Sequence, residues 1–205
     1  MFITIKDNAV AEIIEKKSRF IGQAFIIQNE EQAEDYILKV RKEHYKATHN
    51  CYAYQLDENI QKFSDDGEPS GTAGRPIFDV IKGKEIKNAL VVVTRYFGGT
   101  LLGTGGLVRA YSRATKEVIE QAELIRMVTI KLIKLVCSYN EFGKLEYLLK
   151  SNNYIIRETL FTNEVNVFVE VTVENVEHFK KFLIDKTNNS IKIIEKNIEL
   201  IAQNI

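Results

Sequence analysis

The alternation of hydrophobic and polar positions predicts strands in the first part of the chain. Residues 10–15 and 19–27 read as two strands joined by the polar stretch Lys-Lys-Ser. A third strand is expected in the segment CYAYQL, which begins at Cys51. The continuous apolar run ALVVV from Ala89 is typical of a strand that is covered on both faces.

Other segments carry hydrophobic residues at helical spacing. A helix is expected to begin at Asn29, a favourable capping residue that Gln32 follows, and its apolar stripe consists of Ala33, Tyr36, Ile37 and Val40. A short helix is expected through Ile77, Phe78, Val80 and Ile81. The longest predicted helix has its apolar positions at Leu107, Tyr111, Ala114, Val118, Ile119 and Ala122.

Beyond residue 126 the order of the elements changes. A strand over 127–137 leads into Ser138, which forms a capping-box pattern with Glu141 ahead of a helix. The remaining predicted elements are strands over 154–161 and 163–173, a helix over 175–186 and a strand over 191–200. This β-α-β-β-α-β order is the split βαβ pattern of a ferredoxin-like domain.

The two patterns together predict two α+β domains, residues 1–126 and 127–205. A chain of 205 residues is long enough for two small cores. No linker rich in proline or glycine marks the junction, which we place near residues 125–129. The domain boundary therefore rests on the change in the order of the elements.

Composition and charge limit the kinds of partner. The chain is 45% hydrophobic and 27% charged, with no stretch long enough for a membrane-spanning helix and no basic leader before an apolar segment. We therefore expect a cytoplasmic protein that does not bind membranes. Positive and negative charges balance over residues 1–126 and again over 127–205, so neither half has the basic excess of a typical nucleic-acid domain. A polyanion would have to bind a local patch.

The segment YFGGTLLGTGGLVR, residues 96–109, holds five glycines between a predicted strand and a predicted helix. A Walker A loop is excluded because Thr104 stands where the lysine should be, and a dinucleotide fingerprint is excluded because Val108 replaces its third glycine. Two interpretations remain. Thr104 caps a helix whose first N–H groups, at Gly105 and Gly106, bind an anion, or the glycines only allow tight packing at positive φ.

Arginines near this loop favour the anion-binding interpretation. Arg95 precedes the loop and Arg109 follows the first turn of the helix. Arg113 is different, because Glu117 lies one helical turn further on and can pair with it on a solvated face.

A second segment, SDDGEPSGTAGRP, spans residues 64–76. Its acids Asp65, Asp66 and Glu68 could hold Mg²⁺, but their spacing is not that of an EF-hand, and acids beside glycine more often form turns. His49 and Cys51 would share one face of a strand and could supply two metal ligands, yet no further ligands cluster with them. We therefore expect no metal site.

These two segments together carry a family resemblance. SDDGEPSGTAGRPI, followed by VVVTRYFGGTLLGTGGLVRAYS, resembles the YigZ family, whose first domain is shared with the eukaryotic IMPACT proteins. The resemblance covers residues 1–125 strongly and the remainder weakly. It implies a first domain with the β-α fold of a small-subunit ribosomal protein and of a domain of the translocating elongation factor. It implies a ferredoxin-like second domain.

The resemblance also implies a role in translation. Eukaryotic relatives regulate initiation by competing for an activator of an initiation-factor kinase, and bacterial members resemble nucleic-acid-binding or ribosome-binding proteins by fold. We therefore expect a non-catalytic protein, without cofactor, that binds RNA or the ribosome and modulates translation. A protein partner in translation control is a further expectation. The predicted contacts to phosphate are Arg75, Arg95, Thr100, Thr104, Gly105, Gly106 and Arg109.

Two further expectations concern the same region. The aromatic residues that could stack on bases, if exposed, are Tyr52, Tyr54, Tyr96 and Phe97. The alternative function is a phosphate-handling enzyme similar to small-molecule kinases. In that enzyme the loop 98–106 would hold phosphates, and Asp65, Asp66 or Glu68 would hold Mg²⁺ or act as the base.

Overall fold

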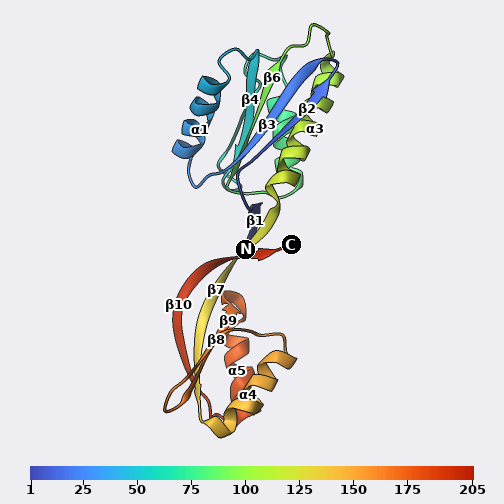
Figure 1. The fold of residues 1–205 in the computed structure, drawn as a ribbon. Coiled ribbons are helices and arrows are strands. Elements are labelled where there is room, and N and C mark those ends of the chain that lie inside the picture. The colour runs from blue at the N-terminus through green and yellow to red at the C-terminus, as the bar shows by residue number, and fades with distance from the viewer. The chain divides into compact units, whose positions relative to one another are not determined.

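The structure is a computed structural model that describes all 205 residues. It contains two compact units, Phe2–Arg126 and Met127–Gln203, which we call the N-terminal and the C-terminal domain (Figure 1). Each domain combines helices with a mainly antiparallel sheet, so the predicted two-domain α+β class is confirmed. Independent folding of residues 1–126 and 127–205 stays a prediction. None of the helices is both long enough and apolar enough to cross a membrane.

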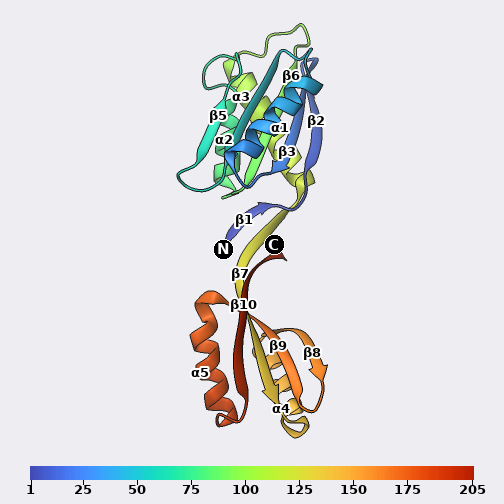
Figure 2. The same ribbon diagram turned by 90° about the vertical axis from the view of Figure 1, so that its left-hand side faces the viewer.

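The sheet of the N-terminal domain has five antiparallel strands in the order β2-β3-β6-β4-β5 (Figure 2). They are β2 (Ala9–Glu15), β3 (Ser18–Ile26), β4 (His49–Gln55), β5 (Gln61–Ser64) and β6 (Ala89–Tyr96). A further strand, β1 (Phe2–Ile5), precedes them, and the carbonyl of Ile3 accepts the N–H of Lys87 at 2.8 Å. The sequence pattern missed the two shortest strands, β1 and β5.

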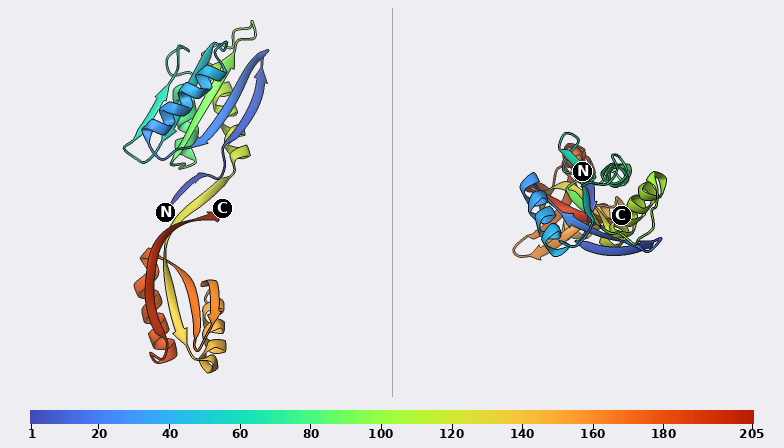
Figure 3. Two further views of the ribbon diagram at one scale, coloured as in Figure 1. Left: turned by 60° about the vertical axis from the view of Figure 1, so that its left-hand side comes forward. Right: turned by 90° about the horizontal axis from the view of Figure 1, so that it is seen from above.

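Helices cover both faces of this sheet. One face packs against α1 (Glu30–Glu43), and the opposite face packs against α2 (Gly74–Gly83) and α3 (Thr104–Ala122) (Figures 1 and 3). The central strand β6 serves both layers, because Leu90 and Val92 join the α1 cluster while Val91 and Val93 join the other. This explains the continuous apolar run and confirms the strand predicted for it.

Local side-chain contacts fix the predicted start of α1. The Asn29 side chain accepts the N–H of Gln32 at 2.9 Å, and the Gln32 side chain accepts the N–H of Gln28 at 2.8 Å. These bonds satisfy backbone donors that a helix start leaves free. The cap predicted at Asn29 is confirmed.

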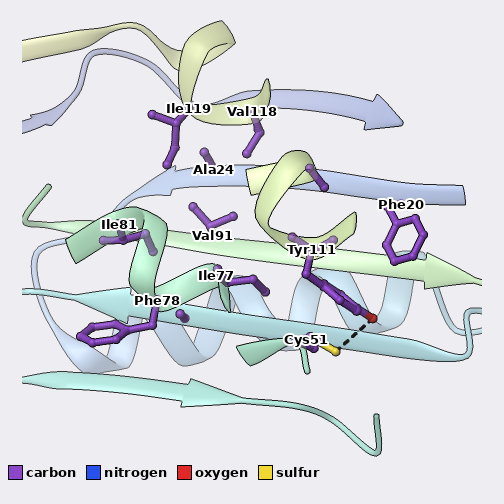
Figure 4. Close-up of a cluster of buried hydrophobic side chains, with 14 of the residues drawn as sticks. Phe20, Ala24, Cys51, Ile77, Phe78, Ile81, Val91, Tyr111, Val118 and Ile119 are labelled. Carbon is purple, nitrogen blue, oxygen red and sulfur yellow. Dashed lines mark hydrogen bonds between the residues drawn. The ribbon is translucent and has the colours of Figure 1, made fainter. Parts of the chain in front are cut away.

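The larger core of the N-terminal domain lies between the sheet and the helices α2 and α3 (Figure 4). Phe20 on β3 meets Tyr111 on α3 edge to face, with ring centroids 5.2 Å apart. The Cys51 thiol on β4 lies 3.4 Å from the Tyr111 hydroxyl. A polar group of Tyr111 thus lies inside an otherwise apolar layer and needs partners there.

The C-terminal domain has the predicted ferredoxin-like order, and its strands pair as β10-β7-β9-β8. Its elements are β7 (Leu124–Cys137), α4 (Tyr139–Ser151), β8 (Ile155–Phe161), β9 (Val165–Thr172), the 3₁₀ turn η1 (Val173–Asn175), α5 (Val176–Thr187) and β10 (Lys192–Asn204). The alternating valines of β9 are buried in one cluster with Leu145 of α4 and Phe179 of α5. Ser138 and Glu141 form the capping box that the sequence predicted.

Candidate anion-binding site

The glycine loop ends where α3 begins. Gly103 is the N-cap residue, and the first helical backbone bond runs from the N–H of Leu107 to the carbonyl of Gly103 at 2.9 Å. The N–H groups of Thr104, Gly105 and Gly106 have no acceptor within the protein. Because the helix dipole adds positive potential at this end, the three N–H groups favour an anion.

The expected capping role of Thr104 is wrong. The cap position falls on Gly103, whose φ of 72° is one that glycine adopts readily and other residues adopt rarely. No side chain caps the helix. The turn thus places a glycine at the cap position. The helix N–H groups that a capping side chain would have bonded therefore have no acceptor.

The glycines of the loop serve different purposes. A Cβ atom on Gly98 would lie 2.0 Å from the carbonyl carbon of Lys17, so this glycine is required for packing against the β2–β3 turn. Gly99 has a φ of 79° and open space around it, so its role is conformational. A Cβ atom on Gly105 would meet only the Arg109 side chain, at 3.5 Å. Packing therefore explains Gly98, while Gly105 leaves an accessible backbone.

The structure brings together part of the predicted phosphate-binding set. Thr104, Gly105 and Gly106 form the first turn of α3, and Arg109, on the next turn, is exposed and has no carboxylate within ion-pair distance. We call these four residues the anion-binding surface. Thr100 is exposed in the loop before it. Anion binding itself stays a prediction.

Arg75 does not belong to this group. It lies in the first turn of α2, where its Nε donates to Asp79 Oδ1 at 2.7 Å on an exposed face. It lines a separate groove between α2 and α3, together with Lys84 and Lys116. Its charge is already paired.

Arg95 was expected to supply charge to a bound anion, and the structure shows that its guanidinium is paired inside the domain. The residue is 5% exposed, and its Nη1 donates to Glu68 Oε1 at 2.7 Å. The guanidinium carbon lies 5.4 Å from the ring centroid of Phe20 and 5.6 Å from that of Phe97. β6 is the central strand, and helices cover both faces of the sheet. The Arg95 side chain, near the end of β6, therefore points into a packed layer rather than to solvent.

Glu68 is the centre of a buried polar network. Its Oε1 also accepts the Tyr111 hydroxyl at 2.7 Å. Burial raises the pKa of Tyr111 and, likewise, that of the Cys51 thiol, so both stay protonated. The expectation that Glu68 would be an ordinary turn residue is therefore wrong, because it is buried and compensates the charge of Arg95.

The neighbouring acids hold the backbone of their own loop. Asp65 accepts three backbone N–H groups, from Gly71 at 2.8 Å, Ala73 at 3.0 Å and Gly74 at 2.8 Å, and so fixes the start of α2. Asp66 accepts the N–H of Asn50 at 2.7 Å and pairs with Arg41. No group of three His, Cys, Asp or Glu side chains is placed to hold a metal ion.

These contacts weigh against Asp65 and Asp66 as the metal ligands or the base of the kinase-like alternative. A carboxylate that binds Mg²⁺ or takes a proton needs a free oxygen directed at the ligand. Both oxygens of Asp65 and both of Asp66 are engaged within the protein. The acidic loop is arranged as a support for α2 and β4.

A cavity of about 400 Å³ lies beside the start of α3. Its walls are mostly apolar and include Pro69, Phe97, Leu101, Leu102 and Leu107. Gly103 and Thr104 form part of its edge, and the polar residues that line it are Thr48, His49, Glu68 and Arg95. The cavity and the anion-binding surface are therefore adjacent.

Of the aromatic residues considered for base stacking, only one presents its ring at this site. Phe97 is 49% exposed and lines the cavity. Tyr54 is fully buried and donates to Glu30 at 2.8 Å, while the Tyr96 hydroxyl lies 3.0 Å from His44 Nδ1. Tyr52 packs against the α1 cluster.

Sequence patterns missed His49 and Glu68 as residues of one site. The strand period did place His49 and Cys51 on the same face of β4, and both contact the acidic loop, since His49 Nδ1 lies 2.8 Å from the carbonyl oxygen of Asp66. His49 lies near Glu68, 3.8 Å from Nε2 to Oε2, because a loop distant in sequence folds back over β4. The spacing of residues along the sequence does not predict this long-range approach of Glu68 to β4.

The fold and this geometry define a two-domain α+β protein with a ferredoxin-like C-terminal domain. A model of the Impact N-terminal domain matches residues 16–119, and a model of a domain of unknown function, DUF1949, matches residues 135–190. The chain belongs to the IMPACT family. The resemblance carried by the two sequence segments is thereby confirmed.

Individual relatives match over most of their length. The chain is 36% identical to IMPACT family member YvyE of Bacillus subtilis (strain 168), over 95% of this chain and 90% of that protein. It is 34% identical to IMPACT family member YigZ of Escherichia coli (strain K12), over 87% and 90%. A crystal structure described as that of a hypothetical protein is 31% identical, with a TM-score of 0.61, and the match covers 96% of this chain and 97% of that one.

Proposed function

We propose that this protein is a non-catalytic module that binds RNA or the ribosome and modulates translation. The anion-binding surface meets a phosphate of the RNA backbone. Arg109 supplies charge, and the N–H groups of Thr104, Gly105 and Gly106 donate hydrogen bonds. The protein works in the cytoplasm and needs no cofactor.

The proposal rests on the start of α3, where the first backbone N–H groups have no acceptor in the protein. Three backbone donors without acceptors and one exposed arginine without a carboxylate partner lie within the first two turns of one helix. Charges balance over each domain as a whole, so a local patch of this kind is what binding to a polyanion requires. Gly105 keeps the backbone accessible, since a Cβ atom at this position would meet only the Arg109 side chain, at 3.5 Å.

Family membership supports the proposed role in translation. The family resemblance implies folds shared with a ribosomal protein and an elongation factor, and it implies regulation of initiation in eukaryotic relatives. These support a ribosomal target over an unrelated RNA. A protein partner on the ribosome is compatible with the same surface.

Co-sedimentation with ribosomes tests the proposal. Wild-type protein is expected to pellet with ribosomes at low salt, and Arg109→Ala is expected to reduce the bound fraction. Arg113→Ala is the matched control, because Arg113 lies on the same helix but pairs with Glu117 at 3.9 Å. Binding that is absent in wild type, or equally strong in Arg109→Ala and wild type, would contradict the proposed surface.

A further inference from the structure

The strand β2 forms one edge of the N-terminal sheet and lacks the features that protect other edge strands of this protein (Figure 2). It has seven residues and contains neither proline nor lysine. β5, at the opposite edge, has only four residues and carries Lys62. β8, an edge of the C-terminal sheet, has a register irregularity between Ile156 and Glu158. Short strands, lysines and bulges prevent pairing between edges, so β2 is free to pair.

The outward backbone groups of β2 belong to three residues. A two-residue turn, Lys16–Lys17 with φ of 45° and 68°, joins β2 to β3, so Glu15 and Ser18 form a hydrogen-bonded pair. Bonded and non-bonded pairs alternate along an antiparallel ladder, and every second residue of β2 therefore directs its N–H and C=O groups away from β3. These residues are Val10, Glu12 and Ile14.

The side chains of the same three residues lie on the exposed face of β2. Val10 and Ile14 are 61% and 65% exposed. Glu12, between them, accepts from Arg19 Nε at 2.7 Å and from Arg19 Nη2 at 3.0 Å, so its charge is compensated within the chain. The outer side of β2 thus presents a hydrophobic residue, a compensated acid and a second hydrophobic residue.

We propose that the β2 edge pairs with the β2 edge of a second copy of this chain. In antiparallel pairing about a two-fold axis at Glu12, Val10 lies opposite Ile14 of the second copy, and Glu12 lies opposite its equivalent. Every outward N–H group then meets an outward C=O group, with two hydrogen bonds for each pair of residues. Displacement of the register by two residues would instead place Val10 opposite Glu12 of the second copy.

The symmetry of β2 favours a second copy over a different protein. A strand that pairs with itself must be complementary to itself about one residue, and β2 has this property about Glu12. Two β-branched side chains pair favourably across strands, whereas bare like charges would repel each other. Each Glu12 brings its own Arg19, so the axis carries equal numbers of carboxylates and guanidinium groups. The pairing closes as a dimer and does not depend on RNA binding.

The dimer is expected to be weak, because only the seven residues of β2 contribute the strand pairing. Sedimentation equilibrium of the wild-type chain measures the pairing directly. The dimer fraction is expected to increase with protein concentration up to about 0.5 mM, where even weak association is populated. A wild type that stays monomeric over this range would overturn the proposal.

Two variants test whether the dimer uses β2. Ile14→Lys replaces an exposed side chain and is expected to weaken dimerisation about tenfold or more, since the substitution occurs twice in the dimer. Leu38→Lys, on α1, is the matched control, because Leu38 is 53% exposed and lies outside β2, and it is expected to dimerise like wild type. Melting temperatures check that both variants are folded. Dimerisation that Ile14→Lys leaves unchanged would overturn the proposal.

Oxidative cross-linking tests the register. Glu12→Cys places its thiol opposite that of the second copy, where the Cα atoms of a bonded pair lie about 5.5 Å apart, within reach of a disulfide. Mild oxidation is expected to give a covalent dimer on a non-reducing gel. Val10→Cys alone is expected to give none, since its equivalent lies about 14 Å away along the strand. The native cysteines are buried.

A mixture of Val10→Cys and Ile14→Cys is expected to form the mixed disulfide dimer, because these two positions lie opposite each other. Cross-linking of Val10→Cys alone that equals that of Glu12→Cys would contradict the register. A monomeric wild type whose Ile14→Lys variant loses ribosome binding would assign the β2 edge to a different partner and overturn the dimer. Ribosome binding by a wild type that dimerises leaves both proposals intact.

Discussion

Arg95 Nη1 lies 2.7 Å from Glu68 Oε1, and the two side chains are only 6% and 3% exposed. This ion pair joins β6, directly before the glycine loop, to the segment over residues 64–76. The two segments that carry the family resemblance are therefore parts of one buried network, which supports the cavity beside α3. Their joint presence in the sequence has a structural cause.

Removal of one partner of this pair is expected to destabilise the N-terminal domain strongly. Glu68→Ala leaves the Arg95 charge buried and unpaired, and we expect the free energy of unfolding to fall by about 3–5 kcal/mol. Urea denaturation measures the change. Glu117→Ala, which removes the partner of an exposed pair, is the control and is expected to cost at most about 0.5 kcal/mol. Equal stability of the two variants would contradict the buried network.

Asp65 is expected to stabilise α2 rather than to bind metal. Asp65→Ala removes the acceptor of three N–H groups, two of them at the start of the helix, and we expect a loss of about 2 kcal/mol in the free energy of unfolding. Mg²⁺, with or without ATP, is expected to leave the melting temperature of wild type unchanged. A magnesium-dependent increase with ATP, abolished in Asp66→Ala, would favour the kinase-like alternative instead.

Two glycines of the same loop are expected to respond in opposite ways to alanine. Gly98→Ala places a methyl group on the Lys17 backbone and is expected to lower the melting temperature markedly, because overpacking typically costs about 1–3 kcal/mol. Gly105→Ala has room for its methyl group and is expected to keep or slightly raise the stability. The same variant is expected to weaken RNA binding, since the methyl group crowds the backbone donors. Thermal unfolding and RNA titration of both variants show whether each glycine serves packing or phosphate binding.

The Cys51 thiol is expected to be inert in the folded protein. Burial raises its pKa, so the reactive thiolate is not formed near neutral pH. Because the folded pKa is raised, the stability that this group contributes is present below the ordinary thiol pKa and decreases as the pH rises above it. A thiol reagent at pH 8 should modify Cys51 only after denaturant is added. Rapid modification in the native protein would contradict the burial of this residue.

Local patterns predicted most of the fold. The caps at Asn29 and Ser138 and the apolar run of β6 were recognisable because each depends on residues close in sequence. β5 was missed because its four residues, with Phe63 half exposed, are too few to show a period. Such a short edge strand is specified by its partner β4.

The candidate site was predicted less completely. The glycines and Arg109 were identified because a helix start has a local signature, whereas the pairing of Arg95 with Glu68 joins residues on distant segments. Thr104 was misplaced as the cap because sequence does not report that the turn requires a positive φ at Gly103. Long-range contacts and backbone conformation therefore decide which of the predicted residues face a ligand.

The salt dependence of RNA binding tests the central claim most directly. We expect wild type to lose affinity linearly in a plot of log K against log salt concentration, and Arg109→Ala to reduce the slope by about one, because one counterion-releasing contact is lost. The reduction should be the same for RNAs of different sequence, and Arg113→Ala should keep the wild-type slope. An Arg109→Ala variant with unchanged affinity and unchanged slope would show that the glycine loop is only a packing device and that the start of α3 does not bind phosphate.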